Sequence, residues 1–249
     1  MSEVRVTVLG SAGSYPGGGR ACSGYLVTAG GYRLLLDCGN GSLANLPCAH
    51  ADVDAIVLSH LHPDHCVDIY GMDIALRYGP RPGTVDVYAP TGSGERLAWL
   101  LGDDGGAAFL DTCRFHPVED GDAVELGPAS VSFRRAAHPV DALVSRVEVA
   151  GRVVAYSGDS GPAPALVASA KDADLFICDA TWPERAGPFP PGVHCTGAEA
   201  GAMAAQAGAA RLLITHVQPA YDPDEVAAEA SGCFAGEVLV ARDGQEITL

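Results

Sequence analysis

Residues 58–68 read LSHLHPDHCVD and place His60, His62, Asp64 and His65 within six consecutive positions. The chain of 249 residues contains only eight histidines, so three of them in one short segment are a marked concentration. The residues just before this segment, DAIV, have the aliphatic and β-branched composition of a strand. Imidazole and carboxylate groups are common ligands of divalent metal ions. The segment therefore predicts a metal site in a loop at the end of a strand.

The loop offers its candidate ligands as two pairs. His60 and His62 are expected to point the same way, while Asp64 and His65 lie on the other side of the turn that Pro63 restricts. Two pairs of ligands on one tight loop can serve two metal ions rather than one. A solvated polar loop is the alternative, but it does not explain the positions of the remaining histidines.

Three further residues of ligand type follow predicted strands at separate places in the chain. Each comes directly after an aliphatic or aromatic run, and strand ends on neighbouring strands converge at one edge of a sheet. Together with the loop they make seven candidate ligands, five histidines and two aspartates. The predicted sets are His60, His62 and His138 for the first ion, Asp64, His65 and His216 for the second, and Asp159 as a bridge between them.

This donor set predicts a hydrolase that uses two divalent metal ions. Zinc is the first choice for imidazole and carboxylate ligands, with manganese or iron as alternatives. A water molecule on such ions loses a proton near pH 7, compared with about 15.7 for free water, and the hydroxide attacks carbon or phosphorus. We also regard Asp64 as a catalytic candidate, because its removal is expected to abolish metal binding and turnover. Two ions leave the site positively charged, which favours a small anionic substrate.

Composition narrows the range of partners. The net charge is −16, from 15 basic and 31 acidic residues, so neither nucleic acid nor an anionic membrane surface is an expected partner. No apolar run is long enough to span a membrane, and the first residues, MSEVRVTVLG, lack the features of a signal peptide. None of the eight cysteines forms a C-x-x-C pair, which favours reduced thiols and a cytoplasmic location. The oligomeric state stays open, with a homodimer among the alternatives.

The order of the predicted elements indicates an α/β fold. Strand-like runs dominate the first third, a helical pattern follows at 66–79, and strands then alternate with helices. This order predicts two mixed β-sheets with helices on their outer faces, within a single domain over residues 1–249. We expect rim loops at 102–114 and 183–193. The last residues, EVLVARDGQEITL (237–249), predict a hairpin closed at Asp-Gly.

The pattern H-x-H-x-D-H and the order of the later ligands resemble the metallo-β-lactamase superfamily. This resemblance covers nearly the whole chain and implies an αββα four-layer sandwich with the site at one edge of the β layers. The segment LLLDCGNG (34–41) is similar to the family's strand end that bears an aspartate. The resemblance implies that Asp37 accepts a hydrogen bond from a ligating histidine, as such histidines usually require. A plain turn at the strand end is the alternative for Asp37.

Three segments resemble ribonuclease Z and its phosphodiesterase relatives. They are VLGSAGSYPGGGRACSGYLV (8–27), CDATW (178–182) and HCTGAEAG (194–201). In that branch the corresponding histidine, paired with the acidic residue, contacts the scissile phosphate and assists the leaving group. The resemblance implies these roles for His194 and Asp179.

The local sequence around His194 is compatible with that role. Thr196 and Glu199 form a T-x-x-E capping box, which predicts a helix that begins beside His194. The N-terminus of a helix favours anions, and an imidazolium there could protonate a departing alkoxide while Asp179 orients it. The alternative is that His194 only hydrogen-bonds a loop.

One feature of ribonuclease Z is missing from the sequence. Only twenty residues separate His138 from Asp159, and they read as a hairpin rather than as the long arm that clamps transfer RNA. Together with the acidic charge, this favours a small phosphodiester, such as a cyclic nucleotide or a related metabolite. The glycine-rich loop 10–19 could approach a phosphate with its backbone N–H groups, or it could be a rim loop.

Two other classes of function remain open at this point. A lactonase or thioesterase could use the same ions on a carboxyl ester, but its mechanism would not explain the presence of His194 and Asp179. A metal-binding scaffold without catalysis is the other alternative, and a missing ligand would favour it. No ligand is missing from this sequence.

Overall fold

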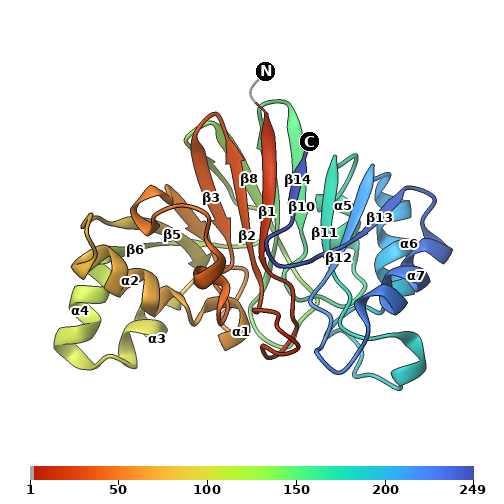
Figure 1. Ribbon diagram of the computed structural model, residues 1–249, viewed down its shortest axis with the longest axis horizontal. Coiled ribbons are helices and arrows are strands. Elements are labelled where there is room, and N and C mark those ends of the chain that lie inside the picture. Colours follow the sequence, from red (N-terminus) through yellow and green to blue (C-terminus); the bar gives the residue numbers. More distant parts are fainter. Residues whose placement is uncertain (1–2) are drawn as a thin grey trace.

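The computed structural model describes residues 3–249 and places two seven-stranded sheets face to face (Figure 1). The first sheet has the order β14-β1-β2-β3-β4-β5-β6, and the second has the order β13-β12-β11-β10-β9-β8-β7. The first sheet contains β1 (Val4–Gly10), β2 (Gly24–Ala29), β3 (Tyr32–Leu36), β4 (Ala55–Val57), β5 (Val85–Pro90), β6 (Cys113–Val118) and β14 (Glu246–Thr248). The second contains β7 (Ala123–Leu126), β8 (Ala129–Arg135), β9 (Leu143–Val149), β10 (Arg152–Tyr156), β11 (Leu175–Asp179), β12 (Arg211–Thr215) and β13 (Glu237–Val240).

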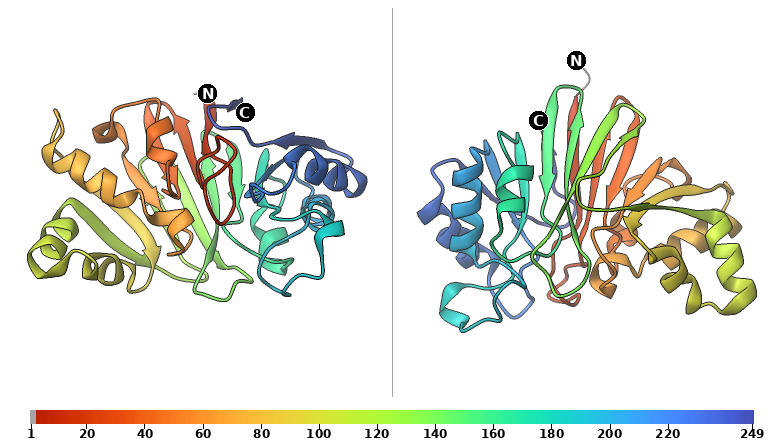
Figure 2. Two further views of the ribbon diagram at one scale, coloured as in Figure 1. Left: turned by 60° about the horizontal axis from the view of Figure 1, so that its bottom comes forward. Right: turned by 180° about the vertical axis from the view of Figure 1, so that it is seen from behind.

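Helices cover the outer face of each sheet. The first sheet is covered by α2, α3 and α4, and the second by α5, α6 and α7, so that the layers follow the order αββα (Figures 1 and 2). The α-helices are α1 (Pro63–Cys66), α2 (Ile69–Tyr78), α3 (Ser93–Trp99), α4 (Gly102–Thr112), α5 (Pro164–Ser169), α6 (Gly197–Ala207) and α7 (Pro223–Cys233). Short 3-10 turns occur at η1 (Ser42–Asn45), η2 (His50–Asp52) and η3 (Glu184–Ala186). The predicted four-layer sandwich is confirmed.

The burial of each strand follows from its neighbours. Strand β8 alternates buried and partly exposed residues, and its Val131 and Phe133 enter the core between the two sheets. Strand β11 pairs in parallel with strands on both sides and is buried at every residue, because helices cover its outer face. The parallel strands of the second sheet therefore provide a rigid base for the residues at their ends.

The predicted C-terminal hairpin is wrong. The Asp-Gly turn is present, and the Gln245 N–H donates to the Arg242 carbonyl at 2.9 Å. However, β13 pairs in parallel with β12 in the second sheet, whereas β14 pairs antiparallel with β1 in the first. Each strand pairs with the free edge of a different sheet, which leaves fewer unpaired backbone groups than a separate hairpin would.

The predicted rim loop at 102–114 is also wrong. Residues Gly102–Thr112 form α4, and the chain then enters β6. The helix contains two adjacent glycines, Gly105 and Gly106, although glycine has low helix propensity. Packing overrides this propensity: Phe109 is fully buried, and a Cβ on Gly106 would lie 2.8 Å from the Ala98 carbonyl oxygen. The other predicted rim loop, at 183–193, contains only η3.

The strands that precede the candidate ligands end at the same edge of the sandwich. In Figure 1 this is the lower edge, where α1 and the loop after β1 lie between the two sheets. The helix expected at 66–79 is divided into a single turn, α1, and the longer α2. Within residues 3–249, no helix is long and apolar enough to cross a membrane.

Candidate metal centre

The loop after β4, which carries four of the candidate ligands, continues directly into α1. His62 is the residue just before the first turn of α1 and makes no side-chain hydrogen bond to it, and Pro63 occupies that turn, where its missing N–H has no cost. Asp64 and His65 therefore lie within a helical turn rather than in a free loop. The His65 carbonyl accepts the Cys38 N–H at 2.8 Å, which ties this turn to the end of β3.

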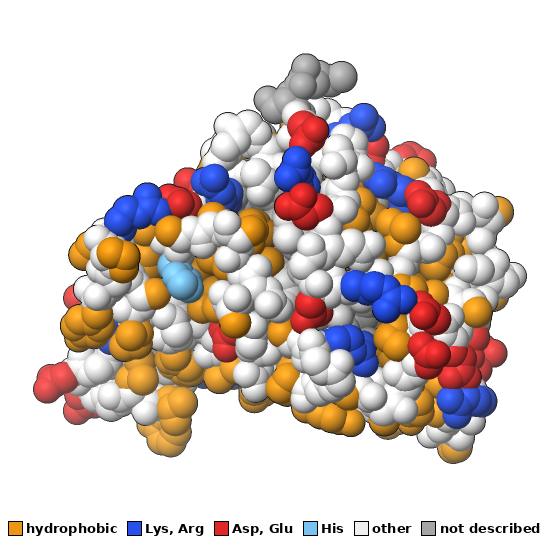
Figure 3. Space-filling model, in the orientation of Figure 1, with side chains coloured by type: hydrophobic (Ala, Val, Ile, Leu, Met, Phe, Trp, Pro, Cys, Tyr) orange, Lys and Arg blue, Asp and Glu red, His pale blue; other side chains and the backbone are white. Residues whose placement is uncertain are grey.

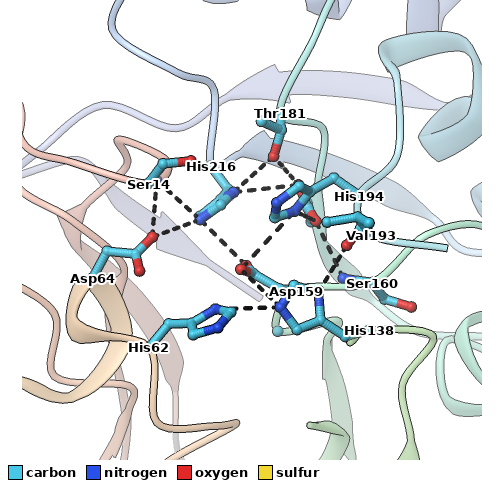
Figure 4. A network of polar contacts seen from close by, with 12 residues as sticks. Ser14, His62, Asp64, His138, Asp159, Ser160, Thr181, Val193, His194 and His216 are labelled. Carbon is cyan, nitrogen blue, oxygen red and sulfur yellow. Dashed lines mark hydrogen bonds and ion pairs between the residues drawn. The ribbon is translucent and has the colours of Figure 1, made fainter. Parts of the chain in front are cut away.

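The first cluster is formed by His60, His62 and His138, which we call the three-histidine group, together with Asp159. One potential ligand atom from each of the four residues lies within 4.8 Å of the others. Nε2 of His138 lies 3.3 Å from Nδ1 of His62, and Nε2 of His60 lies 3.5 Å from Oδ2 of Asp159 (Figure 4 shows His62, His138 and Asp159). The side chains therefore converge on one point from both sheets.

The second cluster is formed by Asp64, His65 and His216, which we call the Asp64 group, again with Asp159. Its four ligand atoms also lie within 4.8 Å of one another. Nε2 of His216 lies 3.2 Å from Nε2 of His65 and 3.2 Å from Oδ2 of Asp64. Oδ1 of Asp159 faces this cluster, at 2.9 Å from Nε2 of His65, while Oδ2 faces the three-histidine group. The structure thus brings all seven predicted residues together, with Asp159 between the two clusters.

The chemistry of these donors fits divalent cations. Two pairs of imidazole nitrogens face each other at 3.2 and 3.3 Å, an arrangement that a cation between them would stabilise. Among the residues that the structure describes, none offers a hydrogen bond to the buried Nε2 of His60. A buried polar atom without a partner is costly unless an ion or a water molecule satisfies it.

Asp37 orients two of the histidines through hydrogen bonds. Its carboxylate is fully buried and accepts hydrogen bonds from His65 Nδ1 at 2.6 Å and from the Tyr156 hydroxyl at 2.6 Å. The Ser59 hydroxyl also donates to Asp37, at 2.7 Å, so it accepts from Nδ1 of His60 at 3.0 Å. Both histidines therefore present Nε2 to the centre, and the hydrogen bond from His65 to Asp37 is the contact that the family resemblance implied.

His216 is oriented by a similar chain of hydrogen bonds, which passes through a hydroxyl group to a carboxylate. The Thr181 hydroxyl donates to Asp179 at 2.7 Å, so it accepts from Nδ1 of His216 at 2.8 Å. Beside it, the backbone of the glycine-rich loop comes close to the ligands, and the Ser14 N–H donates to Oδ2 of Asp64 at 2.8 Å. A Cβ on Gly13 would lie 2.0 Å from the His216 carbonyl oxygen, so only glycine permits this approach.

His194 and Asp179 form a pair at the side of the centre. Nδ1 of His194 donates to Oδ2 of Asp179 at 2.7 Å. The His194 ring stacks on His216 with the ring centroids 5.1 Å apart (Figure 4 shows both rings). Nδ1 of His194 lies 3.9 Å from Oδ2 of Asp159. The predicted capping box is present at Thr196 and begins α6 just after His194. The structure therefore places this pair next to the candidate metal ligands.

The histidines differ in the direction in which their surroundings shift the pKa. Burial lowers the pKa of His60 well below its ordinary value, and the neighbouring His65 lowers it further, which favours the neutral imidazole that a metal ion would require. Burial also acts against protonation of His216, but Asp159 and the carboxylates of Asp179 and Asp64 outweigh it and raise the pKa of His216 to about 10. A bound divalent cation would compete with that proton for the same carboxylates.

Sequence reasoning did not identify several residues of the centre. Ser59, Tyr156 and Thr181 act through hydrogen bonds to Asp37 or Asp179, and Gly13 and Ser14 act through close backbone approach. None of these contacts has a local spacing signal. The glycines of loop 10–19 were the one available indication, and the sequence alone did not show which of them touches a ligand.

Comparison with known proteins agrees with this geometry. Residues 32–217 match the family described as "Beta-lactamase superfamily domain". The chain is 39% identical to "Uncharacterized protein Rv1339" of Mycobacterium tuberculosis over 246 residues, which covers 95% of this chain and 89% of that protein. It is 31% identical to a ribonuclease Z of Haloferax volcanii, which covers 98% of this chain and 95% of that protein.

The relative named "Probable metallo-hydrolase YhfI" of Bacillus subtilis is 32% identical, with 97% of this chain and 98% of that protein covered. Its crystal structure superimposes with a TM-score of 0.89 over the full length of both chains. The matched family, these relatives and the convergent cluster of histidines and aspartates give one consistent assignment. This chain belongs to the β-lactamase superfamily of metal-dependent hydrolases.

Proposed function

We propose that this protein hydrolyses a small phosphodiester, such as a cyclic nucleotide or a related metabolite, with two divalent metal ions. Zinc is the preferred ion for this donor set, with manganese or iron as alternatives. The three-histidine group would hold one ion, the Asp64 group would hold the other, and Asp159 would contact both. When bound, such ions lower the pKa of a shared water molecule to near 7 and stabilise developing negative charge.

The pairing of His194 with Asp179 is the observation that favours a phosphodiester. Nδ1 of His194 is engaged by the buried Asp179 at 2.7 Å, so Nε2 is the nitrogen available to donate a proton. Asp179 fixes this tautomer, because it is buried and is itself held by hydrogen bonds from the Thr181 hydroxyl and the Ser160 N–H. An alkoxide leaving group needs such a proton.

A carboxyl-ester hydrolase explains the site less completely. A lactonase or thioesterase could use the same ions, but its mechanism would not require the His194–Asp179 pair. The relatives whose names specify an activity include ribonuclease Z, whose substrate is a phosphodiester. On the face in Figure 3, basic side chains are scattered and mostly lie beside acidic ones, which supports a small substrate rather than a nucleic acid.

Leaving-group dependence provides the test. We would compare metal-loaded wild type with His194→Ala on 3′,5′-cyclic AMP, which has an alkoxide leaving group, and on bis(p-nitrophenyl) phosphate, whose leaving group needs no proton. The expected loss on the cyclic nucleotide is about 10²–10⁴-fold, the usual contribution of a general acid, and clearly larger than the loss on the aryl ester. Lactones and thioesters complete the substrate panel.

A matched control is His116→Ala, which removes a half-exposed histidine that pairs with Asp86 on the outer part of the first sheet. It should leave the ratio of the two activities unchanged. Equal losses on both phosphodiesters in His194→Ala would remove the proton-donor role. Turnover of lactones or thioesters without any phosphodiester turnover would contradict the proposed function itself.

A further inference from the structure

A cavity of about 300 Å³ adjoins the candidate metal centre at His62. Its walls include the apolar side chains of Leu61, Leu97 and Val140, and Arg96 also lines it. The volume lies at the lower end of the range for small-ligand pockets. Because His62 belongs both to the three-histidine group and to the wall of this cavity, one small molecule can reach both places.

Arg96 is the unpaired cation of this cavity. It lies on α3 and is exposed, and within residues 3–249 its guanidinium makes no ion pair or hydrogen bond. Asp141 also lines the cavity, but its carboxylate is bound to Arg135 at 2.5 Å. Nothing in the described cavity therefore neutralises Arg96.

The two hydroxyl groups of the cavity already donate hydrogen bonds to other residues. The Ser93 hydroxyl donates to the Pro90 carbonyl at 2.5 Å, and the Thr91 hydroxyl donates to Glu119 at 3.1 Å. Arg96 therefore brings five N–H groups with no partner among the described residues to this pocket, beside the ring of His62. An occupant that fits apolar walls and a planar fork of donors is a flat group with hydrogen-bond acceptors on its edge.

We propose that Arg96 determines specificity by holding the base of a nucleoside phosphodiester in this cavity, while the phosphate of the same molecule lies at the metal centre. This inference rests on the proposed phosphodiesterase function and specifies its substrate class. A nucleobase offers a flat face for the apolar walls and ring nitrogen or carbonyl acceptors for the guanidinium. A bare second anion would match the charge of Arg96 but not the three aliphatic side chains.

The test compares two substrates that share a phosphodiester and differ in the base. These are 3′,5′-cyclic AMP and methyl p-nitrophenyl phosphate, measured on metal-loaded wild type, Arg96→Ala and Arg96→Lys. We expect the ratio of kcat/KM for cyclic AMP over the methyl ester to fall about tenfold or more in Arg96→Ala, mainly through KM. Arg96→Lys should stay low, because an ammonium keeps the charge but loses the planar fork.

Two further variants test whether the cavity itself, and not only the charge of Arg96, affects the ratio. Val140→Trp fills the cavity from a side chain that is 41% exposed, so the fold should tolerate it, and it should lower the same ratio. Arg81→Ala is the matched control, since Arg81 is an exposed arginine paired with Asp52 outside the cavity. It should leave the ratio unchanged.

The outcomes separate this inference from the proposed function. If wild type cleaves the methyl ester but not cyclic AMP, the phosphodiesterase function stands and the base-binding role is wrong. An unchanged ratio in Arg96→Ala, or full recovery in Arg96→Lys, also overturns the inference, the latter in favour of simple charge recognition. Wild type that cleaves neither substrate contradicts both proposals.

Discussion

The two halves of the candidate metal centre differ in how their ligands are supported. In the Asp64 group every ligand has a strong second contact: Asp64 accepts the Ser14 N–H, His65 bonds Asp37 directly, and His216 reaches Asp179 through a hydroxyl. In the three-histidine group, His60 reaches Asp37 through the Ser59 hydroxyl, but His138 donates only to the neutral Val193 carbonyl at 2.9 Å. Orientation by a carboxylate raises the basicity of a ligating histidine, so the two halves should not bind metal equally.

Charge and burial also favour tighter metal binding by the Asp64 group. The Asp64 group contributes a carboxylate of its own in addition to the shared Asp159, whereas the three-histidine group has only imidazole rings besides Asp159. All members of the Asp64 group are buried, while His62 is half-buried at the cavity. We therefore expect the Asp64 group to bind its ion more tightly, and the three-histidine group to hold the more readily lost ion.

The largest effect is expected from Asp159, which faces both groups. Asp159→Asn keeps the size of the side chain and removes the shared negative charge, so both ions should bind weakly. Turnover should fall about a thousandfold or more, because attack and charge stabilisation both depend on the ions. Metal content by mass spectrometry and kcat on a phosphodiester provide the measurement. The control is Asp111→Asn on the exposed surface of α4, which should retain both ions.

The next effect distinguishes the two groups from each other. A chelator titration of wild type should release metal in two steps. His62→Ala should remove the step at low chelator concentration, and His65→Ala should remove the step at high concentration. If His62→Ala instead eliminated the tighter step, the ranking of the two groups would be reversed.

A smaller effect is expected from the supporting carboxylate. Asp37→Asn should lower metal affinity about 10–100-fold, the usual effect of losing such a contact. Asp37 has φ +58°, which asparagine also adopts readily, so the backbone should be preserved. Asp54→Asn, on an exposed aspartate that accepts the Arg33 N–H, is the matched control. Similar affinities for both variants would show that Asp37 has only a structural role.

The smallest effect concerns the stability of the whole protein. Metal at 100 times its dissociation constant stabilises the native state by about 2.7 kcal/mol per site, which is about 5–10 °C in Tm for a chain of this size. Thermal unfolding before and after chelation measures this shift. A Tm that does not depend on metal would mean that the seven side chains do not form a binding site in the folded state.

The sequence alone predicted the loop ligands because their spacing is local. His60, His62, Asp64 and His65 belong to one strand end and one helical turn, so their proximity needs no knowledge of the fold. The capping box at Thr196 is local in the same way and is confirmed. The fold class also followed from local patterns, since strand and helix periods are visible in the sequence.

The remaining features depend on contacts between distant segments. The relay from His216 through Thr181 to Asp179 joins the ends of two strands with their neighbouring loop, and no spacing rule predicts it. The separation of β13 and β14 into different sheets depends on which edges are free. In α4, a buried Phe109 and close packing outweigh weak helix propensity. In each case tertiary contacts decide between local alternatives.

Anomalous X-ray diffraction at the zinc edge, on crystals of zinc-loaded protein, tests the central claim most directly. The account predicts two peaks about 3.5–4 Å apart, the usual separation in two-metal sites. One should be bound by the three-histidine group and the other by the Asp64 group, with one carboxylate oxygen of Asp159 facing each. A single peak, peaks at other residues, or no bound zinc in a correctly folded chain would contradict it.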